Sequence, residues 1–141
     1  MPDSNARAAT ELRMSTFRLA RRLRSEIADD ELSDAQFSVL AQLHMRGPLR
    51  LGQLAELERV SPPSMNRTVN GLESAGYLSR TADETDRRSV NLALTETGTA
   101  TVDETVRRRD AWLATRLGEL SAEERATLDA ASQLMRKLVA Q

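Results

Sequence analysis

Residues 51–95 read LGQLAELERVSPPSMNRTVNGLESAGYLSRTADETDRRSVNLALT, and a helical period gives way to a strand period within this stretch. A short helical pattern occupies 51–58. The serine and two prolines at 61–63 then supply an N-cap and the first positions of a second helix, which runs to Ala75 and ends at Gly76. Two helices of these lengths, joined by a short turn, predict a helix-turn-helix.

The residues after Gly76 have the period of a strand. Apolar and polar side chains alternate over 78–82 and again over 89–95, which predicts two strands. The polar stretch DETDRR at 83–88 joins them as a hairpin tip. The sequence therefore predicts a two-stranded β wing directly behind the helix-turn-helix.

A long helix is expected before this region, over residues 6–29. Its apolar residues recur at helical spacing, while Met14 and Phe17 project roughly opposite to that stripe. The helix therefore has two apolar sides, of which one can pack on its own chain and leave the other for a partner.

Capping signals mark three further helices. Ser33 and Gln36 have the spacing of a capping box, and the helix that they begin stops at Gly47. Thr95 can cap a long helix after the wing. The capping-box spacing recurs at 121–124, where a last helix is expected to begin.

The composition is that of a single globular domain. The chain has 141 residues, of which 40% are hydrophobic and 29% are charged, so one packed domain is expected. Aromatic residues make up only 3%, which favours packed helices over a β-sandwich. Cysteine is absent, so disulfides, thiolate nucleophiles and cysteine-containing zinc sites are excluded.

Charge and hydropathy patterns restrict the location and the partners of the chain. No apolar run approaches the roughly 18 residues that a membrane span needs, and the N-terminus lacks the pattern of a signal peptide. We therefore expect a cytoplasmic protein with no membrane partner. The net charge of −1 excludes a uniformly basic surface, so any surface for nucleic acid must be local.

The second helix of the helix-turn-helix has a core face and a polar face. On a helical wheel, Met65, Val69 and Leu72 fall within one narrow arc. The opposite arc and its flanks carry short polar side chains and one guanidinium, which suit the edges of bases in the major groove. The candidate DNA-contacting residues on this side are Pro63, Ser64, Asn66, Arg67 and Asn70. For this helix taken alone, an ordinary solvated face is the alternative.

The predicted wing tip carries Arg87 and Arg88, and arginine suits the negative potential of a narrow minor groove. The wing carries as many acidic residues as basic ones, so its net charge is zero. Asp86 lies two residues before Arg88, and its carboxylate is expected to hold the Arg88 guanidinium in a fixed direction. The alternative is a surface ion pair without a role, worth under about 1 kcal/mol.

Several short motifs together resemble one known family. They are VSPPSMNR at 60–67, GYL at 76–78, DRR at 86–88 and LALT at 92–95, followed by Gly98. This pattern, and the order of helices around it, is similar to that of the MarR (multiple antibiotic resistance regulator) family. The wing pattern is its most specific part.

The resemblance implies a homodimeric winged helix-turn-helix transcription factor that binds double-stranded DNA. In such proteins the recognition helix enters the major groove and the wing arginine enters the adjacent minor groove. Arg88 matches the wing arginine that Asp86 supports, and Arg87 is expected to touch phosphate. Family members dimerise through their first helix and their last two helices. The residues that match recognition-helix contacts by position are Ser61, Ser64, Asn66 and Arg67.

We therefore expect a mainly α fold with a small β wing, organised as one MarR-like domain over 1–141. Residues 6–29 and 96–141 are expected to form the dimerisation helices, and residues 33–95 the DNA-binding lobe. The expected function is that of a repressor, which acts as a homodimer on a roughly palindromic operator. The alternative is a winged-helix module for protein contacts that does not bind DNA.

No enzymatic activity and no cofactor are expected. The single histidine has no serine or acid at a readable spacing, and a glycine-rich phosphate loop is absent. The resemblance implies a pocket for a phenolic or other small anionic effector, for which Phe17 and His44 are the candidate residues. His44 lies on the apolar face of its predicted helix, where a lone histidine is expected to be a satisfied core residue rather than a metal ligand.

Overall fold

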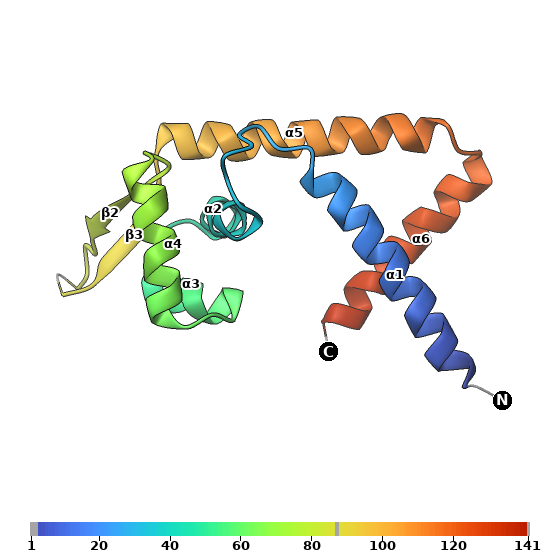
Figure 1. The fold of residues 1–141 in the computed structure, drawn as a ribbon, viewed down its shortest axis with the longest axis horizontal. Helices are drawn as coiled ribbons and strands as arrows, with labels where there is room; N and C mark the ends of the chain where they lie inside the picture. The colour runs from blue at the N-terminus through green and yellow to red at the C-terminus, as the bar shows by residue number, and fades with distance from the viewer. Residues whose placement is uncertain (1–2, 87, 141) are drawn as a thin grey trace. The chain divides into compact units, whose positions relative to one another are not determined.

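The computed structural model describes residues 3–86 and 88–140, which form two compact units. The terminal unit contains the described residues up to 23 and from 109 onward, and the central unit contains those between 24 and 108. The fold is mainly α-helical with one small antiparallel sheet, as expected (Figure 1). None of the helices within the described residues is long and apolar enough to cross a membrane.

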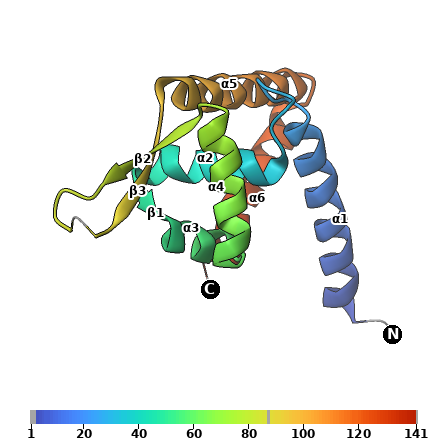
Figure 2. The same ribbon diagram turned by 60° about the vertical axis from the view of Figure 1, so that its left-hand side comes forward.

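The central unit combines short helices with the sheet. Its elements are α2 (Asp34–Arg46), β1 (Leu49–Arg50), α3 (Leu51–Glu58), α4 (Pro62–Ser74), β2 (Leu78–Ala82), β3 (Val90–Leu94) and the first part of α5 (Glu96–Gly118). The strands pair antiparallel in the order β1-β3-β2, and the β2–β3 hairpin extends away from the helices (Figure 2).

The prediction of a two-stranded wing missed one strand. Leu49 pairs with Leu92, and Arg50 pairs with Asn91, so β1 adds a third strand to the edge of β3. A strand of two residues is too short to show a period in the sequence. Its pairing with β3 anchors the wing to the segment that leads into α3.

The core of the central unit lies between α2, α3, α4 and the base of the sheet. Leu40 and Leu54 are completely buried there, and Leu92 of β3 is 1% exposed. The face of α4 that was expected to be buried is buried, with Met65 at 2% exposure and the residues one and two turns further on at 0%. The opposite face of α4 is therefore free to meet a partner.

Local capping signals set the boundaries of these helices as the sequence predicts. The Ser33 hydroxyl accepts the backbone N–H of Gln36, and the Gln36 side-chain Oε1 atom accepts the backbone N–H of Ser33, which completes the capping box of α2. Gly47 ends α2 with a φ of 81°, a conformation that glycine adopts without a side-chain clash. Ser61 caps α4, and α3 and α4 lie side by side (Figure 2).

The start of α5 is locked onto the base of the wing. The Thr95 N–H donates to the Tyr77 carbonyl oxygen at 3.1 Å, and the Thr95 hydroxyl donates to the Gly76 carbonyl oxygen at 2.6 Å. The same hydroxyl accepts the Gly98 N–H at 3.1 Å, so Thr95 caps α5 as expected. Gly98 packs so closely on this turn that a Cβ atom there would overlap the Tyr77 carbonyl oxygen.

The first helix, α1 (Ser4–Arg24), ends five residues before the predicted boundary at 29. Beyond Arg24, the backbone forms hydrogen bonds with residues of α5 in place of helical ones. The Arg109 guanidinium donates to the Leu23 carbonyl oxygen at 3.1 Å, and the Ala28 N–H donates to the buried Thr105 hydroxyl at 3.0 Å. These contacts hold the following segment against α5 and replace the hydrogen bonds of a continuing helix.

The terminal unit consists of α1, the second part of α5 and α6 (Ala122–Val139). The predicted capping box at Ser121 and Glu124 is present at the start of α6. Neither α1 nor α6 has a buried residue among those described, although both carry many apolar side chains. The large apolar residues exposed on these two helices are Leu12, Met14, Phe17, Leu19, Leu128, Leu134, Met135, Leu138 and Val139.

Candidate nucleic-acid interface

The outer face of α4 presents a short polar surface, as the sequence predicts. Ser61, Asn66, Arg67 and Asn70 are exposed together with Pro63, while Ser64 is half-buried. No acidic residue lies in the first turn of α4, and the helix N-terminus carries a partial positive charge. A phosphate group can therefore approach this end of the helix, and base edges can meet the guanidinium and amides beyond it.

Ser61 and Ser64 are joined at the beginning of α4. The Ser61 hydroxyl accepts the Ser64 N–H at 3.2 Å, so its oxygen stabilises the helix end. The hydroxyl proton of Ser61 remains a donor that can contact a phosphate oxygen. The capping role and a contact to DNA are thus compatible at this position.

One residue of the interface was not predicted as a site residue. Arg80 of β2 reaches α4, where its Nη2 atom lies 2.7 Å from the Asn70 Oδ1 atom and 3.3 Å from the Asn66 Oδ1 atom. The signal for it in the sequence is the strand period. Arg80 has the same phase as Leu78, which is 2% exposed, so its side chain is directed to the side of the sheet that packs on the helices.

The wing tip corrects the expected role of Asp86. Its carboxylate accepts the backbone N–H of Arg88 at 3.0 Å and the Ser89 hydroxyl at 3.2 Å. Within the described residues, the structure shows no ion pair between Asp86 and the Arg88 guanidinium. An aspartate readily accepts the N–H two residues further on, because this closes a small turn within the loop. Asp86 therefore shapes the backbone that carries Arg88, and Arg87 lies outside the described residues.

A second aspartate fixes the other end of the wing loop. Hydrogen bonds from the backbone N–H and the hydroxyl of Thr85, followed by one from the Arg50 guanidinium, lower the pKa of Asp83 to about 2. The Arg50 Nη2 atom lies 3.2 Å from the Asp83 Oδ2 atom. The carboxylate thus stays ionised at neutral pH and ties the loop to β1. Asp83 and Asp86, two of the acidic residues whose charges balance those of the wing arginines, therefore form hydrogen bonds that shape the wing loop.

The structure places the two candidate effector residues in different units. His44 is not a core residue, because its side chain is 38% exposed and its Nε2 atom lies 2.8 Å from the Asp103 Oδ1 atom of α5. Leu40 and Leu43 occupy the buried face of α2, which leaves His44 at the rim. Phe17 belongs to α1 and is 61% exposed. An effector pocket formed by these residues stays a prediction.

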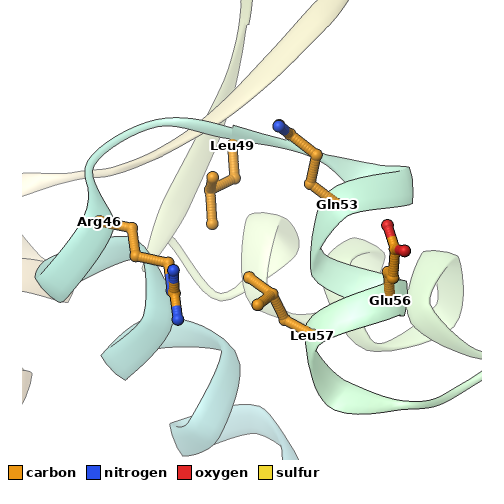
Figure 3. A pocket seen from close by; sticks show the side chains of 5 residues that line it. All are labelled: Arg46, Leu49, Gln53, Glu56 and Leu57. Carbon is orange, nitrogen blue, oxygen red and sulfur yellow. The ribbon is translucent and has the colours of Figure 1, made fainter.

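The central unit contains a pocket at a different place. It lies between the end of α2 and α3, has a volume of about 400 Å³, and is drawn in Figure 3. Two leucines form its apolar part, and a guanidinium and a carboxylate stand at its edges. Its lining residues are Arg46, Leu49, Gln53, Glu56 and Leu57. Among the described residues, no group of three His, Cys, Asp or Glu side chains could hold a metal ion.

The arrangement of α3, α4 and the wing is that of a winged helix-turn-helix protein. A model of the MarR family matches residues 32–90. The HTH-type transcriptional regulator MT0903.1 of Mycobacterium tuberculosis is 39% identical to this chain and is matched over 99% of this chain and 97% of its own length. The chain belongs to the MarR family of transcriptional regulators.

Two further comparisons agree with this assignment. The HTH-type transcriptional repressor MdtR of Bacillus subtilis is 33% identical and is matched over 66% of this chain and 60% of its own length. The crystal structure of RV1404 from Mycobacterium tuberculosis superposes with a TM-score of 0.89 at 26% identity, and covers 100% of this chain and 97% of its own. The resemblance found in the sequence motifs is thereby confirmed.

Proposed function

We propose that this regulator is a repressor that acts as a homodimer on a roughly palindromic operator. The α4 helix would lie in the major groove and the wing in the adjacent minor groove. Regulators of the MarR family bind DNA and act as dimers, and the relative MdtR is a repressor by name. Such a protein works where the chromosome lies, and we place it in the cytoplasm.

The outer face of α4 is the observation that carries this proposal. Its polar side chains stand opposite a helix face that is almost completely buried, so the core holds the outer face in a fixed orientation. Asp86 accepts the backbone N–H of Arg88 and so shapes the wing loop, which belongs to the same compact unit as α4. A module that served only protein contacts would need neither the amide and guanidinium groups of α4 nor an arginine on the wing.

A gel-shift experiment across salt concentrations tests the proposal. The probe is duplex DNA from the region upstream of the coding sequence, with a scrambled duplex of the same length as the control. Specific binding should weaken steeply as salt rises, because phosphate contacts release counterions from DNA. Absence of a shift even in dilute buffer would instead favour the protein-contact module.

Arg67→Ala should cost about 1–3 kcal/mol of specific binding and relax the preference at one base position. Arg67 is exposed on the outer face of α4, and a guanidinium can bridge O6 and N7 of guanine. Binding to a set of operators with single base changes measures this effect. Arg46→Ala at the end of α2 removes the same charge away from the outer face of α4 and serves as the control. An equal loss for all sequences would mean that Arg67 contacts phosphate and reads no base.

Arg88→Ala should weaken binding about tenfold to an operator with A·T-rich flanks, and less to the same operator with G·C-rich flanks. Arginine gains most in a narrow minor groove, where the negative potential is enhanced. The two operators measured with the same protein preparation provide the control. Unchanged binding at the A·T-rich flanks would remove the wing from the interface.

Release by a small anionic effector completes the proposal. The family resemblance supports it. His44 of the central unit is the residue on which we propose to test it, and Phe17 lies in the terminal unit. The His44 side chain is 38% exposed, and its Nδ1 atom is the ring nitrogen that does not contact Asp103. A phenolic acid added to the gel shift should release the operator from the wild-type protein, whereas His44→Ala should require more of it.

A further inference from the structure

The contact between Arg80 and α4 joins the wing to the outer face of this helix. The Arg80 guanidinium reaches Asn70 at 2.7 Å and Asn66 at 3.3 Å, and its Nε atom lies 3.7 Å from the Glu73 Oε1 atom. The side chains of Arg80 and Glu73 are 35% and 42% exposed, so the cluster lies at the surface. Two of the three residues contacted by Arg80 belong to the proposed DNA interface.

The chemistry of the guanidinium dictates how the two amides are turned. Arginine has only N–H donors, so each asparagine must direct its carbonyl oxygen toward Arg80. The amide N–H donors of Asn66 and Asn70 are then directed away from Arg80. The positive charge beside both oxygens also disfavours a second donor there, such as the N6 amino group of adenine.

We propose that Arg80 is a positioning residue that sets the base preference of α4. It fixes Asn66 and Asn70 so that they offer N–H donors to the major groove. It thereby favours guanine or thymine, whose polar groups there are all acceptors, over adenine and cytosine, which present an amino donor. Without this contact, an asparagine amide can pair with both N6 and N7 of adenine. The inference rests on the proposed function, because it assumes that α4 lies in the major groove.

The charge of the cluster agrees with a positioning role. Glu73 stands beside Arg80 and offsets its positive charge. Two amide oxygens accept hydrogen bonds from the Arg80 guanidinium, and the Glu73 carboxylate lies beside it. These contacts leave the guanidinium poorly placed to bind a DNA phosphate. Loss of Arg80 should therefore change which bases are preferred more than it changes the dependence of binding on salt.

Selection of binding sites from a library of randomised duplexes tests this inference. The wild-type protein should select guanine or thymine at the positions that face Asn66 and Asn70. Arg80→Gln should admit adenine there and reduce the ratio of specific to non-specific affinity about tenfold. Arg46→Gln removes an arginine of the same unit that donates to Gln42 on its own helix, and should leave the selected bases unchanged.

A double-mutant cycle measures the coupling between Arg80 and Asn70, which a purely structural role of Arg80 would not produce. In a protein that already carries Asn70→Ala, Arg80→Gln should cost less specificity than it does in the wild type, because the amide that Arg80 orients most closely is gone. Arg80→Lys keeps the charge but has one ammonium group for two amides, so it should show the same change in preference to a smaller degree.

Two results would overturn the inference in different ways. Unchanged base selection by Arg80→Gln, together with a salt dependence lowered by about one phosphate contact, would make Arg80 a phosphate contact. The proposed function would survive that result. Failure of the wild-type protein to select any sequence would remove the proposed function itself, and the role of Arg80 with it.

Discussion

Gly98→Ala should lower the free energy of unfolding of the central unit by about 3 kcal/mol. A methyl group at this position overlaps the backbone carbonyl oxygen of Tyr77, which cannot rotate away as a side chain could. The same carbonyl accepts the Thr95 N–H that joins α5 to the base of the wing. Relief of the overlap must therefore separate α5 from the wing. Urea denaturation followed by circular dichroism measures the loss.

Gly52→Ala is the matched control for this prediction. Gly52 lies within α3 of the same unit, and nothing stands within 4 Å of an added methyl group there. This substitution should raise the free energy of unfolding by about 0.5–1 kcal/mol, because alanine loses less backbone entropy in a helix than glycine. Unfolding of Gly98→Ala at the wild-type urea concentration would contradict the close packing of α5 on Tyr77.

Leu134→Glu should convert the protein to a monomer and weaken operator binding by about 100-fold or more. The Leu134 side chain is 62% exposed on α6, and Leu12, Leu134 and Leu138 line one pocket of the terminal unit. We propose that a second copy covers this apolar surface. A carboxylate buried in that interface would be strongly unfavourable. Two half-sites bound by separate monomers lose the gain in effective concentration that a dimer provides.

Analytical ultracentrifugation and a gel shift on the same samples measure this effect. Gln133→Glu adds the same charge at the neighbouring exposed position of α6 and should leave both the dimer and operator binding intact. A Leu134→Glu protein that remains dimeric would show that this apolar surface is not the interface. A monomeric protein with wild-type affinity would separate dimerisation from DNA binding.

The features that the sequence predicted correctly depend on residues close together in the chain. The capping boxes at Ser33 and Ser121 and the cap at Ser61 each involve residues three positions apart. The helical period of α4 predicted which of its faces is buried, and therefore also predicted the polar surface on the opposite face. The expected partner of Asp86 was wrong, because its carboxylate accepts the backbone N–H of Arg88 and does not pair with the guanidinium.

Errors arose where distant residues meet. The end of α1 depends on contacts with Thr105 and Arg109, which lie about 80 residues further along the chain. His44 was expected in the core, yet it contacts Asp103 at the rim. The strand β1 exists because β3 pairs with it, and its two residues carry no readable period of their own.

The chain's local chemistry alone was enough to establish the helix-turn-helix, its caps, the wing and the family motifs, because periods and caps act over a few neighbouring residues. Folding in three dimensions added the third strand, the contact of Gly98 with Tyr77 and the hold of Arg80 on Asn66 and Asn70. These features join residues that no local period relates. Packing of a strand on a helix brings such residues together. The hydrogen-bond donors and acceptors that meet there then determine the orientation of each side chain.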